Sequence, residues 1–329
     1  EAGDMVGRSC VGTGPYKFVE WKAGIQIEME AFDEYWGTKA NIPHVLYKFV
    51  DDANSRVVML EAGEADMIYS VPATSWAILE SNKDIKAYEQ ASNATRWFFI
   101  NQNVEPLQNA DLRKAIAYAL DFKALTKAVF GTHAVPATSF FAPGILGHTD
   151  NLETYECDIE KAKEYLTKAG YPNGINLDFT MWSQTVQNSM AEIMQAQLAK
   201  AGINITIHAL EPAAFSAALG SGTIQIGIGT NSNTSREPDS AAKVFNSKNF
   251  PKPNYAGVNI PEVDALLEEG RSELDQAKRA PYYEKIQQIV ANECLVLPIC
   301  YENDMYATRA DVEGFHISKS GSQKIAEYS

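Results

Sequence analysis

Residues 171–207 read YPNGINLDFTMWSQTVQNSMAEIMQAQLAKAGINITI, and this stretch decides the fold class. A Pro-Asn-Gly turn at 172–174 is followed by alternating apolar residues over 175–181, which is the period of a half-buried strand. Apolar residues over 186–198 recur instead at helical spacing, and alternation returns over 203–207. A strand, a helix and a strand in this order predict a parallel crossover connection, and hence an α/β fold.

The same two periodicities recur on both sides of this stretch. Glycines and capping residues mark where the expected elements begin and end. A turn at 22–24 joins the first two expected strands as a hairpin, and Pro281 suits the first turn of the last helix. The expected strands occupy 14–21, 24–32, 45–49, 65–71, 224–229 and 295–301. Three expected helices begin near Asn54, at Asn109 or Asp111, and at Asp158. Two further helices are expected over 262–270 and 281–292.

Composition limits the classes of protein to which the chain can belong. With 329 residues, of which 45% are apolar and 21% charged, we expect a globular chain of two lobes or domains. A net charge of −14 without a basic cluster argues against nucleic acid and anionic membrane partners. The longest apolar runs, such as 294–300, reach only strand length, and no secretory signal opens the sequence, so we expect any export signal to lie upstream or to have been removed. Mixed charges and the absence of heptads predict a monomer.

No arrangement of residues predicts chemistry. The sequence has no GxSxG, P-loop, HExxH or GxGxxG motif, and the glycines at 12–14 precede a strand rather than a helix, so we expect neither an enzyme nor a cofactor. His133 and His208 are isolated, and the cysteines lack ligand spacing, so we expect no metal. We favour inert buried thiols over a Cys294–Cys300 disulfide for the four cysteines, which are Cys10, Cys157, Cys294 and Cys300.

A polar stretch over 230–239 follows the expected strand 224–229, at the place where open α/β sheets bind ligands. Its neutral donors and acceptors suit a small polar ligand, although a solvated turn explains them as well. Trp182 ends another strand and either walls a pocket or fills the core. Arg96, beside Trp97, faces a ligand carboxylate or, as we favour, forms an ordinary surface ion pair. The candidate ligand-binding residues are Asn231, Ser232, Asn233, Thr234, Arg236, Trp182, Arg96 and Trp97.

Several short segments, in this order, resemble the oligopeptide/dipeptide/nickel family of ABC-transporter extracytoplasmic solute-binding proteins, the family 5 type. Each segment is weak alone, but together they extend over most of residues 11–315. They are GTGPYKF at 12–18, FIN at 99–101, LRKAIAYALD at 112–121, AGYPNG at 169–174, the helix end at 193–202, EPD at 237–239 and PEVDALL at 261–267.

The resemblance implies a two-lobed periplasmic-binding-protein-like clamshell, type II, cluster C, that encloses its ligand. In the family, the Gly-Thr-Gly-Pro-Tyr motif lies far into the chain, whereas here it begins at Gly12. The resemblance therefore implies that an N-terminal portion is missing and that the first lobe is incomplete. Residues 1–96 would be part of lobe I, 97–298 lobe II, and 299–329 the return to lobe I.

The resemblance also implies a non-enzymatic function, which is the capture of peptides for the membrane permease of a bacterial ABC importer. Thr234 replaces the aspartate that holds the ammonium group of a dipeptide, and 183–187 lacks the arginine that grips its carboxylate, so oligopeptides are favoured over dipeptides. The protein would be extracytoplasmic, in the periplasm or at the cell surface as a lipoprotein. An oligosaccharide or another small polar solute on the same fold, or a ligand sensor for a signalling partner, are the alternatives.

Overall fold

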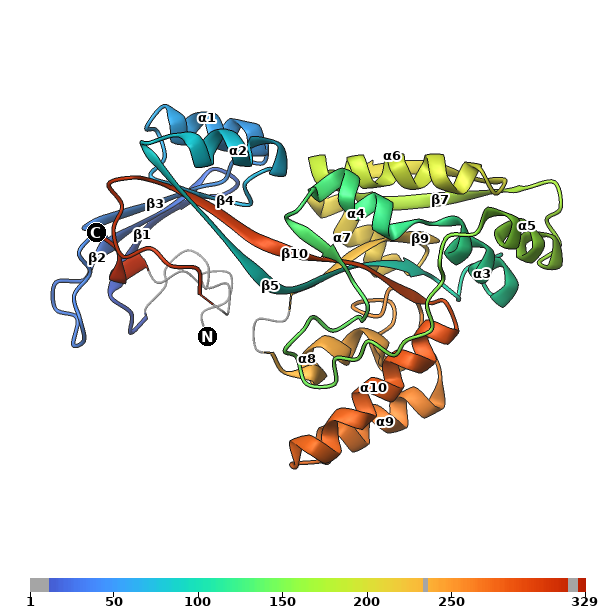
Figure 1. The fold of residues 1–329 in the computed structure, drawn as a ribbon. Coiled ribbons are helices and arrows are strands. Elements are labelled where there is room, and N and C mark those ends of the chain that lie inside the picture. The colour runs from blue at the N-terminus through green and yellow to red at the C-terminus, as the bar shows by residue number, and fades with distance from the viewer. Residues whose placement is uncertain (1–11, 233–235, 319–324) are drawn as a thin grey trace. The chain divides into compact units, whose positions relative to one another are not determined.

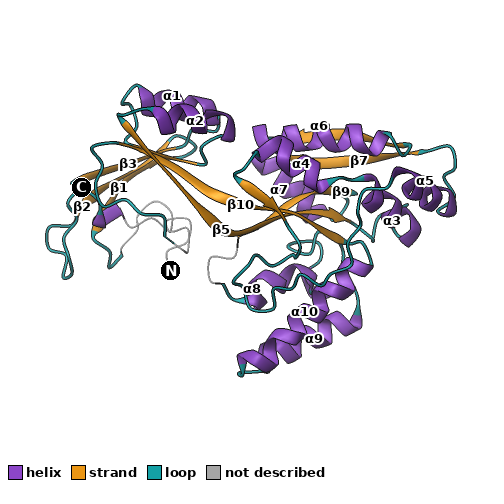
Figure 2. Ribbon diagram, viewed as in Figure 1, coloured by secondary structure: helices purple, strands orange, loops and turns teal. Residues whose placement is uncertain are grey.

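The computed structural model describes residues 12–232, 236–318 and 325–329, and it confirms the α/β class. Helices and strands alternate along the chain (Figures 1 and 2). The chain forms two compact units: the first comprises the chain up to Gln90 and from Asp304 onward, and the second comprises Ala91–Asn303. Two long strands, β5 (Ile85–Ile100) and β10 (Val296–Arg309), contribute to both units. The lobe boundaries after 96 and 298 that the resemblance implies stay a prediction.

The first unit begins with the expected hairpin. The strands β1 (Tyr16–Lys22), β2 (Gln26–Ala31) and β3 (His44–Lys48) form an antiparallel sheet in the order β1-β2-β3. This sheet exposes large apolar side chains, among them Trp21 and Tyr47, whose strand positions both pair with Ile27.

A small helical layer completes the first unit. Helix α1 (Ala53–Glu61) is capped by Asp52 rather than near Asn54, because the Asp52 carboxylate accepts a hydrogen bond from the Ser55 backbone N–H at 2.7 Å. The hydrogen bonds from Ser55 lower the pKa of Asp52. Strand β4 (Met67–Tyr69) pairs with β10, and α2 (Ala73–Ser81) follows it. The pattern of the sequence did not predict α2.

The second unit is built on the crossover that residues 171–207 predict. Strands β7 (Ile175–Trp182) and β8 (Ile203–Leu210) pair in parallel along their whole length, and α6 (Thr185–Ala199) connects them. Strand β9 (Ile226–Ser232) is parallel to β7 and antiparallel to β5. In this unit the strand order is β10-β5-β9-β7-β8, with β6 (Ala134–Pro136) paired to β10. Figure 1 shows α6 running along β7.

The remaining helices of the second unit are capped mostly as expected. Asn109 and Asp158 accept hydrogen bonds from the first turns of α3 and α5. Helix α10 begins at Gln276 because Asp275 caps it, so Pro281 lies inside the helix and not in its first turn. The helices are α3 (Ala110–Ala119), α4 (Phe122–Phe130), α5 (Ile159–Lys168), α7 (Pro212–Ser221), α8 (Pro238–Ala242), α9 (Pro261–Ser272) and α10 (Gln276–Asn292), with 3₁₀ turns at Lys243–Phe245, Ser247–Asn249 and, in the first unit, Ile325–Glu327.

The sheet of the second unit separates two hydrophobic cores, because successive side chains of a strand point to opposite faces. Phe98 and Ile100 of β5 lie in the first core with Phe179 and the buried stripe of α6. Trp97 and Phe99 lie in the second core with residues of α9 and α10.

Two glycines of β9 make room for the aromatic residues of the second core. Gly227 and Gly229 pair with Phe99 and Trp97, and a Cβ at Gly229 would lie 2.5 Å from the Trp97 ring. Such a distance is far below van der Waals contact. The two bulky rings of β5 therefore require glycine on the neighbouring strand.

The cysteines fit the expectation only in part. Cys294 and Cys300 are buried and free, so the disulfide alternative is wrong, and burial raises the pKa of their thiols to about 11 and about 12. Cys157 is exposed, contrary to the expectation of buried thiols, and Cys10 lies outside the described residues.

In 12–232, 236–318 and 325–329, no three His, Cys, Asp or Glu side chains gather as metal ligands, and no helix has the length and apolar character to cross a membrane.

The packing of Trp97 against Gly229 is open to a direct test. The substitution Gly229→Ala places a methyl group against the ring, and overpacking of this kind costs about 1–3 kcal/mol of unfolding free energy. Urea denaturation of the purified variant measures the loss. A Cβ at Gly220, in α7, meets no atom within 4 Å, so Gly220→Ala is the matched control and should not lose stability. Equal stability of Gly229→Ala and the wild type would contradict this account.

Candidate ligand-binding edge

The parallel strands of the second unit end at a common edge. β7, β8 and β9 end at Trp182, Leu210 and Ser232, and we refer to this side of the sheet as the carboxyl edge. Because Ser232 pairs with Ala94 near the start of the second unit, β5 enters this unit beside the end of β9. In open α/β sheets, ligands bind outside the carboxyl ends of the strands. The carboxyl edge is therefore the candidate functional site.

Strand β9 extends further than the sequence predicted. Asn231 and Ser232 belong to the strand and pair with Thr95 and Ala94, whereas the sequence placed them in a loop. The long strand β5 offers backbone partners there, which override the low strand propensity of asparagine and serine. Asn233 and Thr234 lie outside the described residues.

The β5–β9 ladder brings four of the predicted residues together. Arg96 and Trp97 pair with Thr230 and Gly229, directly beside Asn231 and Ser232. Because directly paired residues of two strands share a face, Asn231 lies on the face of Trp97, and Arg96 lies on the opposite face.

Arg96 forms a buried ion pair rather than the surface ion pair that we favoured. Its side chain is 9% exposed, and its Nε lies 2.5 Å from Oε1 of Glu302 on β10. Burial works to lower the pKa of Arg96, but the Glu302 carboxylate outweighs it and raises the pKa overall. Among the described residues, Nη1 of Arg96 has no hydrogen-bond partner.

Trp97 is a core residue with 1% of its surface exposed. Its ring stacks on Tyr255 at 5.8 Å between centroids and meets the edge of Phe140 at 5.4 Å. Trp182 is half-buried at the end of β7, a position that is compatible with either of its two expected roles.

Arg236 is exposed and holds a positive φ of 57°, just before α8. This left-handed conformation is costly for a residue other than glycine and is frequent at functional sites. After Arg236 in the chain, Asp239 accepts hydrogen bonds from the Arg271 guanidinium at both of its carboxylate oxygens, at 3.3 Å or less, and Glu237 forms an ion pair with Arg279. These ion pairs anchor α8 to α9 and α10, so Arg236 precedes an anchored helix.

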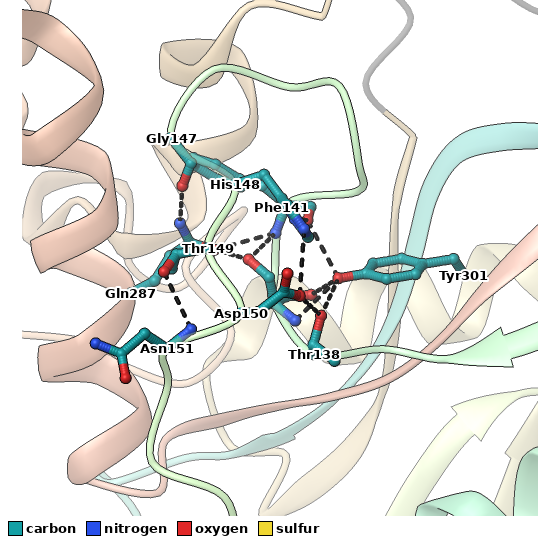
Figure 3. A network of polar contacts seen from close by, with 10 residues as sticks. Thr138, Phe141, Gly147, His148, Thr149, Asp150, Asn151, Gln287 and Tyr301 are labelled. Carbon is teal, nitrogen blue, oxygen red and sulfur yellow. Dashed lines mark hydrogen bonds and ion pairs between the residues drawn. The ribbon is translucent and has the colours of Figure 1, made fainter. Parts of the chain in front are cut away.

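A loop over 137–151 is fixed by buried polar side chains from two other elements (Figure 3). Gln287 of α10 is 2% exposed; its Oε1 accepts from Ser139 and Phe141, and its Nε2 donates to the Gly147 carbonyl at 2.7 Å. The Tyr301 hydroxyl of β10 accepts from the Ser139 N–H at 2.9 Å and donates to the Ser139 carbonyl. Burial raises the pKa of Tyr301, which keeps its hydroxyl protonated as a donor.

The two ends of this loop are tied to each other. Thr138 donates to the Asp150 carboxylate at 2.5 Å, and His148 contacts the same carboxylate at 3.5 Å and the Phe141 carbonyl at 2.7 Å. Sequence reasoning missed this loop because its anchors lie about 140 or more residues away in the chain. The only local signal was the pair of phenylalanines at 140 and 141 in a non-periodic segment.

A hollow of about 290 Å³ lies on the face of the sheet next to α7. Asp178 and His208, which form a pair at 2.9 Å, line it together with Thr180 and Gln225. No sequence pattern had singled out Asp178.

Comparison with known proteins identifies the family. Residues 2–252 match the model of the bacterial extracellular solute-binding proteins, family 5 middle region. The chain belongs to this family.

Relatives in the family bind different solutes, by their names. Heme-binding protein A of Haemophilus influenzae is 30% identical over 319 residues, which is 94% of this chain and 58% of that protein. The glutathione-binding protein GsiB of Escherichia coli is 29% identical over 96% of this chain and 63% of its own length. The chain thus spans about three fifths of the length of these relatives.

Solved structures confirm the fold. The periplasmic binding protein DppA of Helicobacter pylori, in complex with the peptide STSA, superposes with a TM-score of 0.89 at 26% identity, over 96% of this chain and 62% of that chain. A dipeptide-binding protein of Pseudoalteromonas, in complex with Met-Leu, reaches 0.91 at 24% identity over 96% of this chain and 64% of that one. The resemblance seen in the sequence and the binding-protein fold are therefore confirmed.

The anchoring role of Tyr301 gives a stability prediction. Tyr301→Phe removes the hydroxyl and leaves the buried Ser139 backbone groups without their partner, which should cost about 1–3 kcal/mol of unfolding free energy. Chemical denaturation measures this loss. Tyr282→Phe, on the neighbouring helix α10, is the control, because Tyr282 is half-buried and makes no hydroxyl hydrogen bond with the described residues. A Tyr301→Phe variant as stable as this control would contradict the role.

Proposed function

We propose that this chain is the solute-capturing part of a non-enzymatic binding protein that delivers peptides to an ABC importer. The observation that carries the proposal is the carboxyl edge in a chain of this family, because half-buried and exposed side chains gather there beside the strand that enters the second unit. Binding at such an edge needs hydrogen bonds and shape rather than a nucleophile or a metal. Relatives are binding proteins by name, which supports the same reading.

Peptides are the proposed solute, and oligopeptides are favoured over dipeptides. The H. pylori relative at 26% identity holds a four-residue peptide, STSA. At the carboxyl edge, Asn231 and Trp182 offer a neutral amide and an aromatic surface. Neutral groups suit the backbone of a longer peptide better than the charged termini of a dipeptide, which require ion pairs.

The remaining aspects of the function follow from this proposal. The partner would be the permease of an importer, and the protein would act outside the cytoplasm as a monomer, in the periplasm or as a lipoprotein on the cell surface. The family description, extracellular solute-binding proteins, supports that location.

A thermal-shift screen tests the proposed function. Ligand at roughly a hundred times its dissociation constant adds about 2.7 kcal/mol to the stability of the folded state, which raises the melting temperature visibly. The screen uses peptides from dipeptides to octapeptides, oligosaccharides and nickel ions. We expect a shift with peptides longer than two residues. A shift with oligosaccharides alone would overturn the solute class, and no shift with any compound would overturn the binding function.

Arg236 is the residue of the edge region that we expect to contact an anionic group of the solute. Its guanidinium is exposed, and its strained backbone precedes the anchored helix α8. Arg236→Ala should weaken peptide binding by about 1–3 kcal/mol, as for a lost charged hydrogen bond, when measured by calorimetry. Lys200→Ala, at the far end of α6, is the matched control for loss of one exposed positive charge. Equal affinities of the two variants would exclude the contact.

A further inference from the structure

The first turn of α6 leaves its backbone N–H groups without a side-chain cap. The helix begins directly after β7 at the carboxyl edge, and its N-cap residue Gln184 makes no side-chain capping bond. The first intrahelical bond of the helix is donated by Asn188 to the Gln184 carbonyl. The backbone N–H groups of 185–187 are therefore available as donors, as at any uncapped helix start.

Gln187 provides the second, independent observation. Its side chain is 93% buried, since 7% of its surface is exposed, and its Oε1 makes no hydrogen bond with the described residues. In the third helical position, a glutamine usually bonds back to the N-cap backbone, but this bond is absent here. Helical side chains lean toward the N-terminus, so Gln187 covers the first turn. Oδ1 of its neighbour Asn188 is also buried and without a partner among the described residues.

A buried polar atom without a partner is costly, and native structures retain few of them. Gln187 continues the stripe of Met190, Met194 and Leu198 that packs on the sheet, where an apolar side chain would fit without this cost. A glutamine at this position is explained if a bound ligand donates the missing hydrogen bond to its Oε1.

The chemistry of these unpartnered groups defines the ligand group that would satisfy them. The backbone N–H groups need an acceptor, whereas the oxygens of Gln187 and Asn188 need donors. A carboxylate offers only acceptors and would meet two side-chain oxygens, and residues 182–188 contain no cation to compensate. An ammonium group offers only donors and would meet the positive end of the helix dipole. A neutral amide group brings both an acceptor and donors.

We propose that the first turn of α6, with Gln187 and Asn188, binds an uncharged amide group of the solute, such as a peptide unit, and does not bind a charged terminus. This inference rests on the proposed function and specifies which part of a peptide the carboxyl edge recognises. Gln187 is then a specificity-determining residue for backbone amides.

The test compares trialanine with free termini and N-acetyl-trialanine amide, whose termini are uncharged, by titration calorimetry on the full chain. The wild type should bind both peptides, because their internal amide groups are the same whether or not the termini are charged. Gln187→Leu should weaken the binding of both peptides about tenfold, the effect of one lost hydrogen bond with desolvation. Gln195→Leu makes the same chemical change on an exposed part of α6, away from its first turn. It removes a hydrogen bond to the Ile205 carbonyl but no group of the candidate site, so it should bind like the wild type.

Stability separates recognition from a structural role. Because Gln187→Leu removes an unsatisfied buried oxygen, the unliganded variant should melt at the wild-type temperature or higher while its affinity falls. A variant that loses stability and affinity together would overturn the inference. The same two measurements on Asn188→Leu test the other buried side-chain oxygen in the same way. Unchanged affinity in Gln187→Leu, or wild-type binding of the free peptide alone, would overturn the inference while leaving the proposed function intact. Wild-type protein that binds neither peptide would overturn both.

Discussion

The antiparallel ladder between β5 and β9 is the constraint on which the second unit depends. It joins the strand that enters the unit to the parallel pair β7 and β8, and so it links the long connecting strands to the crossover. The ladder closes around Trp97 and Phe99 because glycines face these rings from β9. Its far end carries Asn231 and Ser232 to the carboxyl edge. Core packing and the position of the candidate site are thus set by the same set of backbone pairs.

Most of the second unit could be predicted from local pattern. The crossover over 171–207 and the caps at Asn109 and Asp158 follow from periodicity and capping chemistry, and the structure confirms them. Helices α2, α4 and α7 were missed. Helices α2 and α7 are short, with broad apolar surfaces that give no clear amphipathic period, whereas α4 is amphipathic and capped by Asp121 but follows closely after α3. Strand β9 was predicted too short because its last residues are stabilised by a partner that the local sequence does not reveal.

The sequence indicated where the candidate site lies but not which contacts its side chains make. The rule that ligands lie beyond the carboxyl ends of strands points to Trp182 and Asn231, and the structure places both at that edge. The partner of Arg96 could not be predicted, because Glu302 lies 206 residues away in the chain. Gln187 gave no signal either: a glutamine in an amphipathic helix is ordinary until its burial and its lack of a partner are known.

The alternation of β5 between two cores also bears on how this family can change in evolution. Trp97 and Phe99 fill one core, and Phe98 and Ile100 fill the other. Loss or gain of a single residue in this strand would exchange the two sets and turn Arg96 with its charge toward the opposite face. Single substitutions in β5 leave this alternation intact, whereas an insertion or a deletion disrupts both cores. In the connection between the two units, a change of length is therefore more costly than a change of side chain.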